Sequence, residues 1–161
     1  MTHMATGPVE DTGTEGPGLG DLYLTHHRPL VRLAYLLTGS QAVAEDVVQD
    51  AFVALAPRLD RVDSPAAYLR TSVVNGAKTH HRRTATARSH FAELVTLDVS
   101  PETPVLMDAV AKLPYRNRAA IVLRFYEDRS DEEIAEILGC RRATVRSLVH
   151  RGVERLRREI D

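Results

Sequence analysis

Residues 130–151 combine a helix start, a helix stop and a second helix within one short span. Ser130 and Glu133 have the spacing of a capping box, in which a Ser hydroxyl and a Glu carboxylate satisfy the first free amides of a helix. Gly139 can adopt the left-handed conformation that ends a helix in a tight turn, and Thr144 is a suitable cap for the helix that follows. The span therefore predicts a helix-turn-helix.

Each helix of this unit has an apolar face to bury, and the second also has a basic outer face. The first would bury Ile134, Ala135, Ile137 and Leu138, and the second would bury Val145, Leu148, Val149 and Leu156. The outward face of the second helix is polar and basic, with Arg146, Ser147, His150 and Arg151, and with Arg141 and Arg142 at its start. Charged faces are usually only solvated, but here caps, turn and one-sided basic face agree. Such a helix fits a major groove, which predicts DNA binding.

The rest of the chain is also predicted to be helical. Aromatic residues make up only 5% of it and Trp is absent, so its cores must be built from Leu, Val, Ile and Ala, which favours packed helices. Apolar residues recur at helical spacing, and Ser64-Pro65 has the form of a helix start. We expect helices over 22–39, 41–55, 66–83, 105–113 and 116–126, the last of them burying Phe125.

The predicted fold class is all-α, with two small helical domains joined by a flexible linker. Residues 1–20 are rich in Gly, Pro and acid and predict a disordered tail. Two prolines close the stretch 87–104, which predicts the linker. The domains would then be 21–86 and 105–161. Because a lobe of about 65 residues buries only about 60% of its unfolded surface, each would be marginal alone.

Charge is strongly segregated along the chain, although the net charge is only −1. The stretches 58–88 and 141–158 are basic, whereas 1–21 and 127–136 are acidic. Local rather than net charge steers a chain to phosphates. This pattern is compatible with two separate nucleic-acid contacts.

Other classes of protein find little support. Cys140 is the only cysteine, no run of 18 apolar residues occurs, and the N-terminus lacks a signal-peptide core, so we expect a cytoplasmic protein without membrane insertion. The histidines lack zinc-ligand spacing, so no metal or other cofactor is expected. The acidic group Glu45, Asp46 and Asp50 has no neighbouring base, nucleophile or phosphate loop, so we expect no enzyme activity.

Several motifs in order resemble the sigma-70 family of RNA polymerase factors, in its extracytoplasmic-function (ECF) group. The resemblance covers residues of about 20–160 and rests on Arg32–Gly39, Ala44–Phe52, Ala67–Asn75, Leu113–Arg118, Ser130–Gly139 and Thr144–Ser147 followed by His150-Arg151. It implies two helical lobes, region 2 and region 4. It also implies an alternative sigma factor that binds core polymerase and directs promoter-specific transcription initiation.

The resemblance implies roles for residues of the first lobe. Region 2 binds the clamp helices of the polymerase β′ subunit, which makes Asp46, Gln49 and Asp50 the candidates for that contact. Region 2 also captures the melted −10 element. Asn75 stands where the family reads a flipped-out base, and an amide offers both a donor and an acceptor to a base edge. A base pocket would involve Arg61, Asp63 and Ser64, and phosphates would meet Lys78, Arg82 and Arg83.

In the second lobe the resemblance implies recognition of the −35 element and a contact with the polymerase β flap. The −35 candidates are Arg141, Arg142, Thr144, Arg146, Ser147, His150 and Arg151. The family usually has an anti-sigma factor as a further partner. Gly152 stands where the family usually has Ala, and we expect it to cost the helix about 1 kcal/mol. One alternative stays open: a sigma-like or LuxR-type DNA-binding regulator without promoter-initiating activity.

Overall fold

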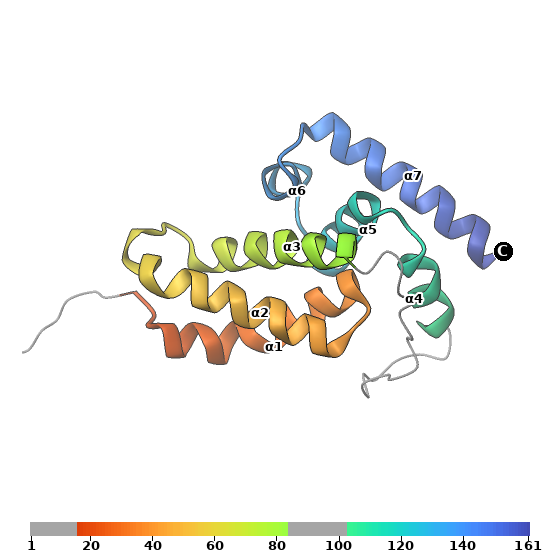
Figure 1. Ribbon diagram of the computed structural model, residues 1–161. Coiled ribbons are helices and arrows are strands. Elements are labelled where there is room, and N and C mark those ends of the chain that lie inside the picture. Colours follow the sequence, from red (N-terminus) through yellow and green to blue (C-terminus); the bar gives the residue numbers. More distant parts are fainter. Residues whose placement is uncertain (1–15, 84–102) are drawn as a thin grey trace, which may run out of the picture.

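The computed structural model describes residues 16–83 and 103–161, and these residues form helices and turns without a strand. The predicted all-α fold with two lobes is confirmed (Figure 1). The predicted tail and linker lie almost entirely outside the described residues. The elements are α1 (Leu19–Thr38), α2 (Gln41–Leu55), the 3-10 helix η1 (Ala56–Arg61), α3 (Pro65–Arg83), α4 (Thr103–Ala111), α5 (Tyr115–Ile121), the π-helix η2 (Val122–Tyr126), α6 (Asp131–Leu138) and α7 (Arg142–Ile160).

The first lobe is a bundle of α1, α2 and α3 in which Gly39, Ser40 and Ser64 mark helix ends. Gly39 has φ of 73° and ends α1, and its N–H donates to the Tyr35 carbonyl at 2.8 Å. The Ser40 hydroxyl accepts from the Val43 N–H at 3.3 Å at the start of α2, and Ser64 accepts from the Ala67 N–H at 3.3 Å at the start of α3. Local capping chemistry therefore sets where these helices begin and end.

The second lobe contains the predicted helix-turn-helix in α6 and α7. The Ser130 hydroxyl accepts from the Glu133 N–H at 3.2 Å while the Ser130 N–H donates to the Glu133 carboxylate at 3.3 Å, so the capping box is confirmed. Gly139 has the expected positive φ, 65°. The prediction that Thr144 caps the second helix is wrong, because α7 begins at Arg142 with Arg141 as its N-cap. Arg142 and Ala143 are good helix formers, so the helix starts before Thr144.

A second correction concerns the segment that was expected to be one helix over 116–126. It is α-helical only to Ile121 and continues as the wider π-helix η2, in which the Glu127 N–H bonds to the Val122 carbonyl at 3.1 Å. A wider turn rotates the residues that follow relative to an α-helical register. Phe125 is consequently 64% exposed, and its predicted place in the core is wrong.

The two lobes dock against each other and share one continuous apolar core. α1 and α3 of the first lobe contact α4, α5 and α6 of the second (Figure 1). Arg70 and His81 of α3 meet the second lobe: Arg70 pairs with Glu127 at 3.4 Å, and the ring centroids of His81 and Tyr115 lie 5.4 Å apart.

Arg118 is the most buried charged residue of the described chain, with 3% of its surface exposed. Its guanidinium donates to the Leu37 carbonyl at 2.8 Å in the last turn of α1, and also to the carbonyls of Ala111 and Leu113 at the end of α4. Carbonyls at helix C-termini carry partial negative charge, which stabilises a cation there. Burial nevertheless lowers the pKa of Arg118. One arginine thus joins the ends of two helices from different lobes.

Tyr115 makes the second buried polar contact between the lobes. Its hydroxyl donates to the Val74 carbonyl of α3 at 2.5 Å. Burial raises the pKa of the Tyr115 hydroxyl well above its usual value, so it stays a neutral donor. Burial and the nearby Arg118 charge lower the pKa of His81, which keeps that ring neutral against Tyr115.

Gly152 has a packing reason that the sequence did not reveal. A Cβ at this buried position of α7 would overlap the Cδ1 of Ile121 in α5, and it would lie 3.6 Å from the Cβ of Asn117. Asn117 reinforces this close crossing, because its amide donates to the Leu148 carbonyl of α7 at 3.0 Å. The absence of a side chain at Gly152 therefore permits a close approach of α7 to α5, at the cost of some helix propensity.

We expect Gly152→Ala to lower the melting temperature in the native sequence, because the new methyl overlaps Ile121. In an Ile121→Ala background, which removes both the overlapping Cδ1 and the Cγ1 that would lie 3.2 Å away, the same change should raise stability by about 1 kcal/mol relative to Ile121→Ala alone. Thermal unfolding followed by circular dichroism measures all four proteins. Equal effects of Gly152→Ala in both backgrounds would contradict the close-crossing explanation.

Candidate polymerase and nucleic-acid interfaces

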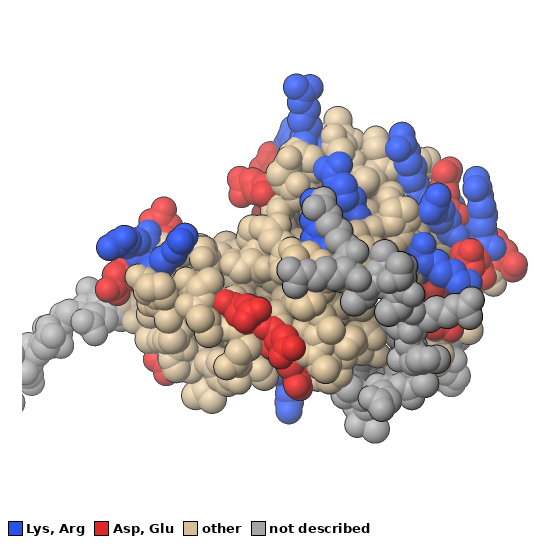
Figure 2. All heavy atoms as spheres, viewed as in Figure 1, with Lys and Arg blue, Asp and Glu red and all other residues tan. Residues whose placement is uncertain are grey.

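The outer face of α2 carries the predicted polymerase-binding residues together. Asp46, Gln49 and Asp50 are all exposed, and their three- and four-residue spacing puts them on one side of the helix. The opposite side of α2 is buried in the first lobe. Acidic side chains gather over this helix in the space-filling view (Figure 2). The candidate residues therefore form one acidic, accessible surface.

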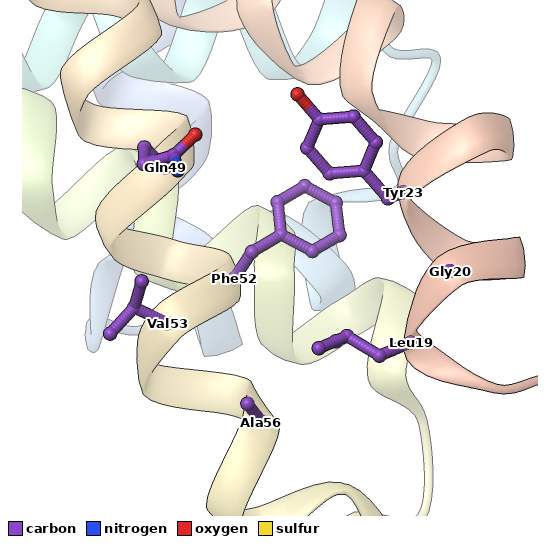
Figure 3. Close-up of a pocket in the computed structure, with 7 residues that line it drawn as sticks. All are labelled: Leu19, Gly20, Tyr23, Gln49, Phe52, Val53 and Ala56. Carbon is purple, nitrogen blue, oxygen red and sulfur yellow. The ribbon is translucent and has the colours of Figure 1, made fainter.

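An apolar pocket adjoins this acidic surface, between the first turns of α1 and the second half of α2. It has a volume of about 400 Å³ and is lined by Leu19, Gly20, Tyr23, Gln49, Phe52, Val53 and Ala56 (Figure 3). The rings of Tyr23 and Phe52 meet at 5.1 Å along its wall. Exposed apolar surface rimmed by polar groups is typical of a protein-binding site. Sequence reasoning missed this pocket, because its walls come from two helices whose pairing no local pattern shows.

A second groove runs between α2 and α3 and brings together residues assigned to different roles. Asp50 and Asn75 both line it, and its volume is about 420 Å³. The two helices approach closely here, since a Cβ on Gly76 would lie only 3.1 Å from the Cγ1 of Val47. The candidate polymerase surface and the candidate base-reading amide are therefore neighbours on one side of the first lobe.

The −10 candidates form a track along α3 rather than one cluster. Arg61, Asp63 and Ser64 are exposed just before the helix, whereas Asn75 lies eleven residues beyond Ser64, about 16 Å along the axis. Asn75 and Lys78 are exposed, and with Arg82 they follow helical spacing on one stripe. The side chains of Arg82 and Arg83 lie outside the described part of the chain. The helix thus offers an elongated surface.

Most of the −35 candidates on α7 are exposed, and three of them pair with carboxylates. Arg142, Arg146 and His150 lie on one stripe at four-residue steps, with Ser147 and Arg151 beside it. Thr144 is half-buried and Arg141 is exposed. The carboxylate partners are Glu132 for Arg142, Asp131 for Arg146 and Glu154 for His150. The first two carboxylates belong to the first turn of α6, and the sequence did not reveal that they pair with α7.

A metal site and a membrane-spanning helix were also sought in residues 16–83 and 103–161. In these ranges no three His, Cys, Asp or Glu side chains lie close enough together to hold a metal ion. No helix within the same ranges is both long and apolar enough to cross a bilayer.

Comparison with protein families divides the chain in the same way as the fold. Residues 22–87 match Sigma-70 region 2, and residues 105–156 match Sigma-70 region 4. The RNA polymerase sigma-E factor of Streptomyces coelicolor is 31% identical over 151 residues, which is 84% of this chain and 82% of that protein. The ECF RNA polymerase sigma factor SigL of Mycobacterium tuberculosis is 31% identical and covers 84% of this chain and 85% of its own.

Solved structures agree with this assignment over both lobes. The sigma factor RpoE of Bartonella quintana, in complex with the anti-sigma factor NepR, has a TM-score of 0.69 and 26% identity, covering 86% of this chain and 93% of its own. CnrH, in complex with the cytosolic domain of CnrY, has a TM-score of 0.67 and 27% identity, covering 86% and 84%. The chain therefore belongs to the sigma-70 family of RNA polymerase sigma factors, in its extracytoplasmic-function group.

Proposed function

We propose that this protein is a cytoplasmic sigma factor that binds core RNA polymerase and directs it to promoters through their −10 and −35 elements. The observation that carries the proposal is the presence, in one chain and in this order, of a region 2 lobe with an acidic outer face beside Asn75 and a region 4 lobe with a basic helix-turn-helix face.

The polymerase contact is assigned to both lobes. Asp46, Gln49 and Asp50 on α2 would meet the β′ clamp helices, and the second lobe would meet the β flap. The apolar pocket beside Gln49 can add buried area to the charged contact. An interface of this composition has an apolar centre and a polar rim, as stable protein interfaces do.

Promoter reading is divided between α3 and α7. Asn75 would bond to a flipped-out base of the −10 strand, while Arg61, Asp63, Ser64, Lys78, Arg82 and Arg83 would contact that strand along α3. The exposed stripe of α7 would enter the major groove at the −35 element. The candidates there are Arg141, Arg142, Thr144, Arg146, Ser147, His150 and Arg151. Base contacts would specify the sequence and phosphate contacts would set the register.

An anti-sigma factor is the further partner that we propose. RpoE of Bartonella quintana was solved with the anti-sigma factor NepR, and it is similar to this chain across both lobes. The docked lobes present the acidic face of α2 and the neighbouring pocket to solvent, so one partner could cover the surface that polymerase needs.

The docked lobes have to separate before both promoter elements are bound. The two elements lie roughly 25 base pairs apart, about 85 Å of B-form DNA, whereas a compact chain of this length has a radius of gyration of about 15 Å. The chain between Arg83 and Thr103 can bridge at most about 70 Å, which permits a wide separation. The polar contacts that would break include those of Arg118 with Leu37, of Tyr115 with Val74 and of Arg70 with Glu127.

Run-off transcription with core polymerase on a pool of genomic promoters tests the proposed function. We expect promoter-specific transcripts with the native protein, and their loss with Asn75→Ala although core binding is retained, because the amide would contact DNA only. Lys112→Ala, whose partner Glu159 is exposed, is the matched surface control. Binding to promoter DNA without any transcript would instead support the DNA-binding regulator, and equal loss of core binding and transcription in Asn75→Ala would make Asn75 structural.

Tyr115→Phe tests the separation of the lobes, because it removes the hydroxyl that bonds to Val74 and keeps the ring. We expect the docked state to lose about 1 kcal/mol, so that the protein unfolds at lower urea concentration but associates faster with core polymerase. Tyr126→Phe, at an exposed tyrosine, is the control. Unchanged association kinetics together with the stability loss would show that docking does not limit polymerase binding.

A further inference from the structure

Asp131 joins three elements of the second lobe. One of its carboxylate oxygens accepts from the Nη1 of Arg124 in η2, and the other lies 3.3 Å from the Nε of Arg146 in α7. Asp131 itself is the first residue of α6, directly after the N-cap Ser130. Its backbone is therefore held by the capping box while its side chain is held by Arg124.

The other ion pairs of the exposed stripe are of a different kind. In the pair of Arg142 with Glu132 the side chains are 57% and 70% exposed, and His150 and Glu154 are i,i+4 neighbours on one helix surface. Exposed pairs of this kind contribute little and exchange partners with solvent. The Asp131 side chain is only 19% exposed, although that of its partner Arg146 is 70% exposed. A largely buried carboxylate is thus paired with a largely exposed arginine.

The bond from Asp131 uses the inner end of the guanidinium. Asp131 engages only the Nε of Arg146, so this bond leaves the Nη1 and Nη2 donors for another acceptor. Two parallel donors of one arginine match the O6 and N7 acceptors of guanine in a major groove. Asp131 thus contacts the end of the guanidinium that is nearer the backbone of Arg146 and leaves the outer end free to contact a base.

We propose that Asp131 is a positioning residue for DNA reading: it orients Arg146 toward a guanine of the −35 duplex without touching DNA itself. This inference rests on the proposed reading of the −35 element by α7. Arg124 has a part in the arrangement, because its positive charge compensates the carboxylate that would otherwise repel the nearby phosphates. Base discrimination at the position of Arg146 then depends on a residue outside the recognition helix.

The test uses the full chain and a duplex that the native protein selects from a randomised pool, together with all single-base variants of that duplex. Affinities are measured by fluorescence anisotropy at one fixed salt concentration. For Asp131→Asn we expect discrimination at one guanine to fall roughly tenfold. Affinity for an unrelated duplex should stay equal or increase, because a negative charge has been removed. A merely structural role would instead lower the affinity for all duplexes alike.

Three further variants separate geometry from charge. Glu132→Gln removes the neighbouring carboxylate and should increase affinity for every duplex without loss of discrimination. Asp131→Glu keeps the charge but moves the carboxylate oxygens, so the protein should lose base discrimination while the salt dependence of its affinity stays unchanged. If Asp131→Asn does not fold, Asp131→Glu provides the test in its place. In an Arg146→Ala background, Asp131→Asn should have no further effect on discrimination.

The outcomes are distinguishable. Native-like discrimination in both Asp131 variants overturns the inference, as does a full effect of Asp131→Asn in the Arg146→Ala background. If the native protein selects no duplex at all, −35 reading by α7 fails, and the role of Asp131 fails with it. A protein that selects a duplex but ignores the Asp131 substitutions keeps the proposed function and loses only the positioning role.

Discussion

The docking of the two lobes depends on the burial of Arg118 between them. Moving a charge out of water costs several kcal/mol unless the protein replaces the lost hydration. Here the replacement comes from the carbonyls at the ends of α1 and α4, which supply oriented dipoles rather than a carboxylate. Since no single lobe provides both helix ends, Arg118 makes all of its carbonyl bonds only when the lobes are docked, and its Nε stays buried without a hydrogen-bond partner even then.

This docking uses one side of α3 and leaves the other free. Val74 and His81 meet the second lobe through Tyr115, whereas Asn75 and Lys78 are exposed on the remaining surface. The acidic face of α2 and the basic stripe of α7 also stay accessible. Docking therefore leaves the candidate contact residues that the structure describes accessible, but it holds the two helices proposed to read DNA close together. The proposed separation of the lobes rests on the distance between the two promoter elements, because docking does not cover the candidate residues.

In the helix-turn-helix lobe, residues outside the proposed recognition surface contact the helix that carries it. Gly152 and Asn117 set how closely α7 crosses α5, and Asp131 approaches Arg146 from α6. None of these three residues needs to contact DNA to affect where the side chains of α7 lie. The departure from the usual Ala at position 152 is explained in this way by packing against Ile121.

Features that depend on neighbours within a few residues could be read without coordinates. The capping box, the turn at Gly139, the bundle helices and the grouping of Asp46, Gln49 and Asp50 on one face follow from spacing along a single helix. The wide turn at η2, the overlap that Gly152 avoids, the pocket at Tyr23 and the pairing of Asp131 with Arg146 required the tertiary structure. So did the contact between Leu37 and Arg118, which stand 81 positions apart. Capping and helical periodicity are set by local bonds that few residues encode, whereas docking depends on many weak contacts between distant surfaces that no short pattern records.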